Sequence, residues 1–120
     1  MLSALLLALA GTTSGEAVAE PPPARWKRIP SVYERALAYP EFASARGAAG
    51  QATLRCRINS LGMPVQCSIH AETPAGYGFG KAVMSLRSEM RFYPPDPAKG
   101  PWVLITLNFD PDPKKALSIH

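Results

Sequence analysis

Two cysteines in an alternating segment constrain the fold of this chain more than any other feature. Cys56 and Cys67 are eleven positions apart, and the residues around both alternate between apolar and polar, which is typical of β-strands. Between the two runs, Asn59-Ser60-Leu61-Gly62 predicts a hairpin turn in which Gly62 supplies a positive φ. The pairs expected to face each other on one apolar side are Ile58–Val65, Cys56–Cys67 and Leu54–Ile69.

The expected cross-strand position of the cysteines predicts a disulfide. Opposed residues in an antiparallel pair have Cα atoms about 4.5–5.5 Å apart, a spacing that a disulfide can bridge. Cys56 and Cys67 are the only cysteines, so only one connectivity is available. A reduced, buried pair is the alternative.

The amino terminus predicts export. An apolar run from Leu2 to Ala10 precedes Ala17-Val18-Ala19, which is typical of a secretory signal peptide, residues 1–19, cleaved after Ala19. No lysine or arginine precedes the apolar run, and a membrane anchor is the alternative. Export agrees with the predicted disulfide, because disulfides persist in oxidising compartments.

The remaining 101 residues (120 − 19) are enough for one small domain with a thin core. The chain is basic, with 13 Lys and Arg against 9 Asp and Glu. These cations are scattered and form no helical stripe with interleaved aromatics, so nucleic-acid binding is not expected. Attraction of the basic surface to anionic lipid or wall polymer is left open by the composition.

Helical signals occur before and after the hairpin. Ser31 and Glu34 form a capping-box pattern for a short helix that runs through Leu37. A second short helix is expected from Glu41 to Arg46. A longer helix is expected from Phe79 to Met90, because apolar residues recur there at spacings of four, three and four.

Trp102 to Phe109 is expected to form a third strand, which alternates like the first two. The order of elements predicts an α+β fold, in which one main helix packs on one face of a small three-stranded antiparallel sheet, with short N-terminal helices. The expected domain covers residues 39–110. It follows a linker and short helix, residues 20–38, and precedes a polar tail, residues 111–120.

Three segments occur in a fixed order along the chain. They are Tyr39-Pro40 followed by a short helix and Gly50, then Asn59-Ser60-Leu61-Gly62, then Met90-Arg91-Phe92-Tyr93-Pro94. Together they resemble, in this order, the opening, the hairpin turn and the run that closes the long helix in the C-terminal domain of the TonB energy transducers, in a disulfide-containing branch. The resemblance extends to Phe109, and it implies the ββαβ fold of that family.

The resemblance also implies a partner and a site. In this family, an extended peptide from an outer-membrane transport receptor pairs with the last strand, which is a form of strand addition. The matching peptide-binding residues are Trp102, Val103, Leu104, Ile105, Thr106, Leu107, Asn108 and Phe109. Ser44 falls at a position that contacts receptors in the family. Trp102 and Leu104 lie on the strand face away from the expected core, where either a partner or the chain's own linker or first helix could cover them.

The chain departs from the complete family pattern, which includes a membrane helix for the ExbB–ExbD motor and a long Pro-rich spacer. The expected linker is only about ten residues, so ExbB–ExbD is expected to be an indirect partner at most. The expected function is that of a periplasmic peptide-binding module. The alternative is a stand-alone secreted envelope protein that binds another envelope component or inhibits an enzyme. Pairing of edge strands between two copies is also left open.

Catalytic chemistry is not expected. The two histidines, His70 and His120, have no neighbours at metal-ligand spacing. Cys56 and Cys67 lack the C-x-x-C spacing of redox catalysts, and Gly76-x-Gly78-x-Gly80 lacks the full pattern of a phosphate loop. We therefore predict no enzyme activity, no metal site and no cofactor.

Overall fold

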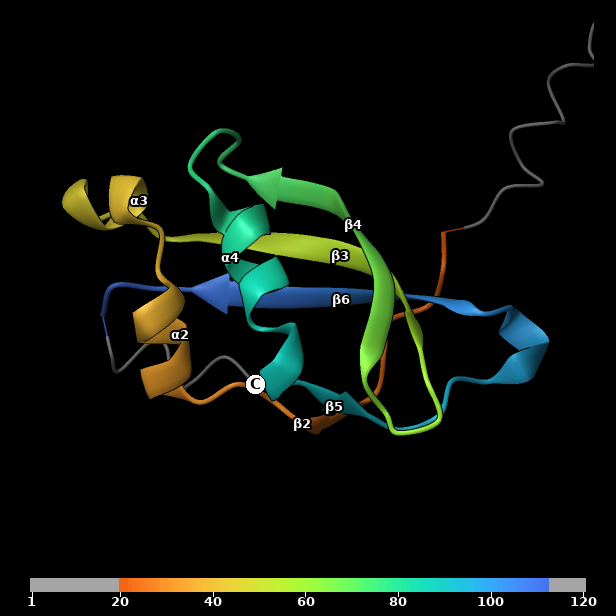
Figure 1. Cartoon of the computed structure of the whole chain (residues 1–120). Helices are drawn as coiled ribbons and strands as arrows, with labels where there is room; N and C mark the ends of the chain where they lie inside the picture. The colour runs from red at the N-terminus through yellow and green to blue at the C-terminus, as the bar shows by residue number, and fades with distance from the viewer. Residues whose placement is uncertain (1–19, 113–120) are drawn as a thin grey trace, which may run out of the picture.

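The computed structural model describes residues 20–112, and Figure 1 shows the arrangement of their helices and strands. The chain has a mixed α/β fold, with a three-stranded antiparallel sheet and a helix packed on it, as the sequence predicts. The strand order is β4–β3–β6, so β3 is central. The predicted signal peptide, residues 1–19, and most of the predicted tail, residues 113–120, lie outside the described residues.

The hairpin consists of β3, Gly50–Ile58, and β4, Pro64–Thr73. Asn59 organises its turn, because its side-chain Oδ1 accepts hydrogen bonds from the backbone N–H groups of Leu61 and Met63, both at 2.9 Å. Gly62 has the predicted positive φ, +83°. A Cβ at Gly62 would lie 2.7 Å from the carbonyl oxygen of Phe92, so only glycine fits here without a shift of the backbone.

The predicted register of the hairpin is right in part. Leu54 pairs with Ile69 as expected, but Ile58 pairs with Pro64 and Val65 pairs with Arg57. The predicted Ile58–Val65 pair is therefore wrong, and Val65 lies on the outer face. The physical reason is that Asn59 N–H donates to the carbonyl of Met63 at 2.9 Å, which closes the turn one residue earlier than expected.

A bulge restores the predicted register. Pairing shifts between Arg55 and Arg57, opposite Gln66, which has a φ of +53°. Cys56 and Cys67 meet at this place and form the predicted disulfide, with Cα atoms 4.2 Å apart. The Cys56 side chain is fully buried, and Cys67 packs against the core from the edge strand.

Helix α4, Phe79–Ser85, covers one face of the sheet (Figure 1). The predicted apolar stripe is buried in the core, but the α-helix does not extend to Met90 as predicted. After Ser85 the chain tightens into a 3₁₀ turn, η2, Arg87–Glu89, in which Met90 N–H donates to the carbonyl of Arg87 at 3.1 Å. The tighter turn keeps Met90 buried while the chain leaves the helix as a strand.

A two-stranded ribbon joins residues that are far apart in the sequence. Strand β2, Trp26–Arg28, pairs antiparallel with β5, Arg91–Phe92. The rings of Trp26 and Phe92 lie 4.4 Å apart and attach this ribbon to the core. Much of the predicted linker thus contributes to the folded domain.

Two short helices and a 3₁₀ turn complete the fold. Helix α2 is Val32–Ala38, α3 is Glu41–Ala45, and the turn η3 is Pro97–Lys99. A capping box formed by Ser31 and Glu34 starts α2. Within residues 20–112, no helix has the length and apolar character needed to cross a membrane.

Candidate functional site

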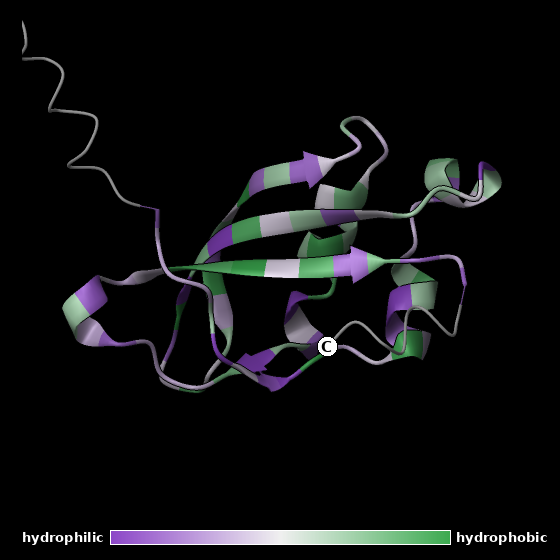
Figure 2. Cartoon of the chain, turned by 180° about the vertical axis from the view of Figure 1, so that it is seen from behind, coloured by the Kyte–Doolittle hydropathy of each residue, from purple (hydrophilic) through white to green (hydrophobic). Residues whose placement is uncertain are grey.

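Strand β6, Trp102–Phe109, has two different faces and one outer edge. Every second residue from Val103 onward is buried between the sheet and α4, and these four residues are Val103, Ile105, Leu107 and Phe109. The other four residues point to the opposite face, which Figure 2 shows with no helix in front of it. The predicted alternation along this strand is therefore observed.

The chain's own amino-terminal segment occupies part of the outer edge of β6. Leu104 N–H donates to the carbonyl of Pro22 at 2.9 Å, and Ala24 N–H donates to the carbonyl of Leu104 at 2.8 Å. Pro23 and Leu104 thus form a parallel β-bridge. The sequence leaves three coverings open for Trp102 and Leu104: a partner, the linker and the first helix. The linker is the one that lies beside Leu104, and its backbone bonds place it at the edge of the strand.

The remainder of this edge is open within the described residues. Backbone groups on a strand point alternately to its two sides. Since Leu104 bonds outward, Thr106 and Asn108 also direct their backbone N–H and C=O groups away from β3. Residues 20–112 provide no other backbone partner on this side of β6.

Cations from β3 cover the aromatic start of β6. The guanidinium of Arg55 lies 3.9 Å from the centre of the Trp102 ring, and that of Arg57 lies 5.8 Å from it. Further along, the hydroxyl oxygens of Thr53 and Thr106 lie 2.7 Å apart. The outer face is therefore less apolar at Trp102 than the sequence suggests.

A cavity of about 230 Å³ lies at the far end of β6. Its lining combines three parts of the chain: α2 and Tyr39, Ser44 of α3, and the end of β6 with the residues that follow it. Ser44, the receptor-contact position implied by the family resemblance, thus lies beside Asn108 and Phe109. The structure brings together two parts of the predicted site that are more than fifty residues apart in the sequence.

Two polar side chains with little contact to solvent line this cavity: Tyr39 is half-buried and Arg35 is buried. The Tyr39 hydroxyl donates to the carbonyl of Ala48. Burial, with a smaller contribution from the negative charge of Asp110, raises the pKa of Tyr39 above its ordinary value. Arg35 on α2 is only 3% exposed, and burial lowers the pKa of its guanidinium. Sequence reasoning missed Arg35, because a single arginine on a short amphipathic helix is normally solvent-exposed.

Helix α2, which forms one wall of the cavity, is held by an ion pair. The Glu34 carboxylate accepts a hydrogen bond from Arg28 at 2.9 Å and another from the backbone of Ser31 at 2.8 Å. These two interactions, with Arg28 the larger, lower the pKa of Glu34 to about 2.

This shift makes the stability of the fold depend on pH. Because the folded pKa lies below the ordinary value of 4.5, the stabilisation is fully present above pH 4.5 and is lost as the pH falls towards 2. We expect Glu34→Gln, which preserves the capping box, to reduce the fall in unfolding free energy between pH 5 and pH 2.5. Urea titrations at both pH values measure it, with Glu41→Gln as the control. Equal pH dependence in wild type and Glu34→Gln would contradict the prediction.

The described residues contain no cluster suited to a metal. No group of three or more His, Cys, Asp or Glu side chains is close enough within residues 20–112. His70 lies 3.1 Å from the carboxylate of Glu20, and this pair belongs to no larger group of such side chains among the described residues. His120 lies outside the described residues.

No protein-family model matches the chain, and no curated protein matches it. The resemblance to the TonB C-terminal domain therefore depends on the order and spacing of its motifs. The outer edge of β6, its partly bound amino-terminal segment and the cavity beside Ser44 together form the candidate site.

Proposed function

We propose that this protein is a TonB-like interaction module of the periplasm that binds extended peptide segments of outer-membrane transport receptors. The peptide adds as a strand to the outer edge of β6. The observation that carries the proposal is the parallel bridge at Leu104, since residues 22–24 already bind this edge through two backbone hydrogen bonds. An edge that accepts one extended segment has the geometry for another.

In this proposal, the peptide first pairs with the open part of the edge and then displaces residues 22–24 from Leu104. Thr106 and Asn108 supply outward backbone donors and acceptors, and these give affinity without depending on the peptide sequence. Selectivity comes from the cavity at the end of the strand, where a peptide side chain meets Ser44 and the ring of Tyr39. ExbB–ExbD is at most an indirect partner.

The bridge at Leu104 also favours a second candidate function. Exposed sheet edges promote unwanted pairing, and many proteins cover them with their own chain. If residues 22–24 are a permanent cover, the protein is a stand-alone envelope protein with a TonB-like fold that binds a different component. The two functions differ in whether the amino-terminal segment can be displaced.

NMR titration with the amino-terminal peptide of a receptor tests the proposal. We expect the amide signals of Thr106 and Asn108 to shift first, because their N–H groups are the open donors, and that of Leu104 to follow as residues 22–24 leave. Leu104→Lys places a charge beside this edge and is expected to weaken binding at least tenfold. Ser68→Lys, on the same sheet face at β4, serves as the matched control.

A second variant separates the two functions. Ala24→Pro removes the N–H group that donates to Leu104 and should release the amino-terminal segment from the edge. The peptide-binding proposal predicts tighter binding by this variant. If several receptor peptides at saturation leave β6 unshifted in both wild type and Ala24→Pro, the receptor function is wrong and the stand-alone function is supported.

A further inference from the structure

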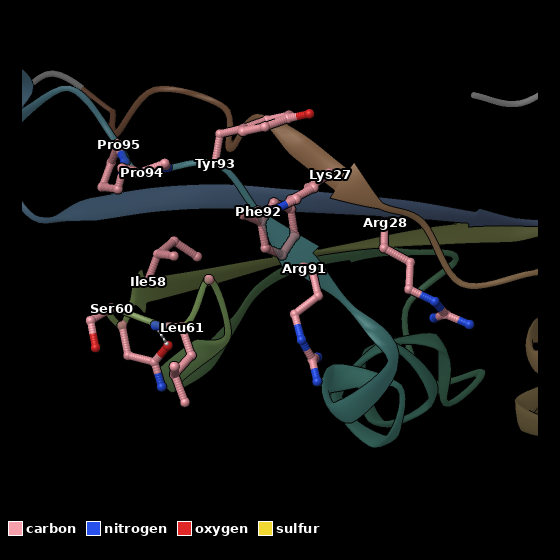
Figure 3. Close-up of a pocket in the computed structure, with 12 residues that line it drawn as sticks. Lys27, Arg28, Ile58, Ser60, Leu61, Arg91, Phe92, Tyr93, Pro94 and Pro95 are labelled. Atoms are coloured by element: carbon pink, nitrogen blue, oxygen red, sulfur yellow. Dashed lines mark hydrogen bonds between the residues drawn. The ribbon is translucent and has the colours of Figure 1, made fainter.

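A second concave surface lies at the hairpin turn, where the turn meets the β2–β5 ribbon. It is an open groove of about 760 Å³ (Figure 3). Its walls are the turn, residues 59–62, and the strands β2 and β5, with Tyr93-Pro94-Pro95 continuing from β5. None of these residues lines the cavity beside Ser44. The groove is therefore separate from the candidate peptide site.

The groove carries positive charge, and two of its three cations form no ion pair with a described residue. Lys27, Arg28 and Arg91 line it, and no Asp or Glu does. Arg28 is paired with Glu34 at 2.9 Å and Glu89 at 3.6 Å. No such ion pair with a described residue forms at Lys27 or Arg91. Arg91 is instead held by the backbone, because its Nη1 donates to the carbonyls of Ser88 and Met90.

Exposed apolar groups flank the same charges. Leu61 at the tip of the turn is 75% exposed, and Tyr93 is 47% exposed. Two cations lie close to the Tyr93 ring. Its centre is 5.8 Å from Lys27 Nζ and 5.7 Å from the Arg25 guanidinium. Figure 3 shows Leu61 on the turn and Arg91 on β5, at opposite sides of the groove. Exposed apolar side chains beside cations without an ion-pair partner suit a layered surface, in which an anionic outer layer covers an apolar layer.

The turn that presents Leu61 is held in place. Phe92 N–H donates to the carbonyl of Gly62 at 2.8 Å, and the side chain of Asn59 fixes the turn from within. Leu61 can therefore enter an apolar layer outside the protein without the entropy cost of first ordering a loop.

We propose that this groove docks the protein on the anionic phospholipid headgroups of a membrane surface. Lys27 and Arg91 contact headgroup phosphates, Leu61 enters the acyl boundary, and Tyr93 lies at the interface, where amphipathic rings are favoured. A soluble anion or an acidic peptide would satisfy the cations but leave Leu61 in water. Each cation near an anionic bilayer strengthens binding about fivefold, so the two together supply about 25-fold.

Co-sedimentation of the protein with vesicles tests the proposal. Vesicles of phosphatidylglycerol and phosphatidylcholine are compared with vesicles of phosphatidylcholine alone, and binding is expected only to the first kind and to weaken with added salt. Leu61→Ser with Lys27→Gln is expected to weaken binding about tenfold or more. Phe42→Ser with Arg46→Gln removes a similar exposed apolar–cation pair from α3 and its C-cap, where the guanidinium lies 3.5 Å from the ring centre. This double variant is expected to have no effect.

Three results would overturn the proposal. The first is equal binding to both kinds of vesicle, and the second is an equal loss in the two double variants. The third is a soluble ligand, inorganic phosphate or a poly-glutamate peptide, that shifts the amide signals of residues 59–62 and 91–93 while vesicles of either kind do not. Because Lys27 and Leu61 are exposed, circular dichroism should show that the groove variant remains folded.

Discussion

Replacing both Cys56 and Cys67 with alanine is expected to lower the free energy of unfolding by about 2–4 kcal/mol. The disulfide closes a loop with a sequence separation of eleven, and so it restricts the unfolded chain. It also lies where the hairpin is least regular, since the register shifts beside Cys56. A domain of about 100 residues has a total stability of only about 5–15 kcal/mol, so this loss is a large fraction of it.

Urea denaturation of the wild type with and without a reductant measures the same quantity without a substitution. The reduced wild type and the double-alanine variant should unfold at similar urea concentrations, and reductant should not affect the variant. Thiol labelling of the unfolded, unreduced protein should find no reactive cysteine. If the oxidised and reduced proteins unfold at the same urea concentration, the bridge has no part in stability.

The regular parts of the fold could be predicted because local patterns determine them. Strand β6 begins and ends at the predicted residues, and the alternation around Cys56 predicts both the hairpin and the disulfide. The turn lies one residue away from its predicted place. Asn59 determines this, because its N–H donates to the carbonyl of Met63 and its side chain accepts from two N–H groups. Period-two patterns do not reveal such a contact, nor the bulge at Gln66 that compensates for it.

The candidate site was less accessible to prediction because it depends on contacts between distant segments. Three consecutive prolines indicate an extended segment, but they do not say which edge it meets. The bridge from Pro23 to Leu104 and the β2–β5 ribbon therefore emerge only in three dimensions. The position of Arg35 is of the same kind, since Arg35 lines one cavity together with residues at the end of β6 that lie far away in the sequence.

A core aromatic links the fold to the site. Phe79 at the start of α4 is fully buried, and its ring centre lies 5.5 Å from that of Phe109 and 5.9 Å from that of Tyr39. A Cβ at Gly50 would lie 2.3 Å from the Phe79 ring, so the ring packs on bare backbone. Tyr39 and Phe109 both line the cavity beside Ser44. Phe79 therefore supports the cavity from the core side.

Phe79→Ala is expected to lower the free energy of unfolding by about 3–5 kcal/mol, since it removes a buried ring and leaves a cavity. Urea denaturation measures the loss. Phe42→Ala is the matched control, because Phe42 is 48% exposed and contacts Tyr77 at the surface, and its loss should stay below about 1 kcal/mol. Similar losses in the two variants would mean that Phe79 is not a central core residue.

Substitutions of Phe79 also test whether core packing positions the candidate site. Without the Phe79 ring, Tyr39 and Phe109 lose a neighbour on one side, and we expect the amide signals of Asn108 and Asp110 to shift even under conditions where Phe79→Ala remains folded. Phe79→Leu fills part of the space and should give smaller shifts and a smaller loss of stability. If Phe79→Ala is strongly destabilised but the signals at the end of β6 do not move, the cavity is set by α2 and α3 rather than by α4. Peptide binding at β6 would then not depend on the core, and the stability of the fold and the shape of the cavity would depend on different contacts.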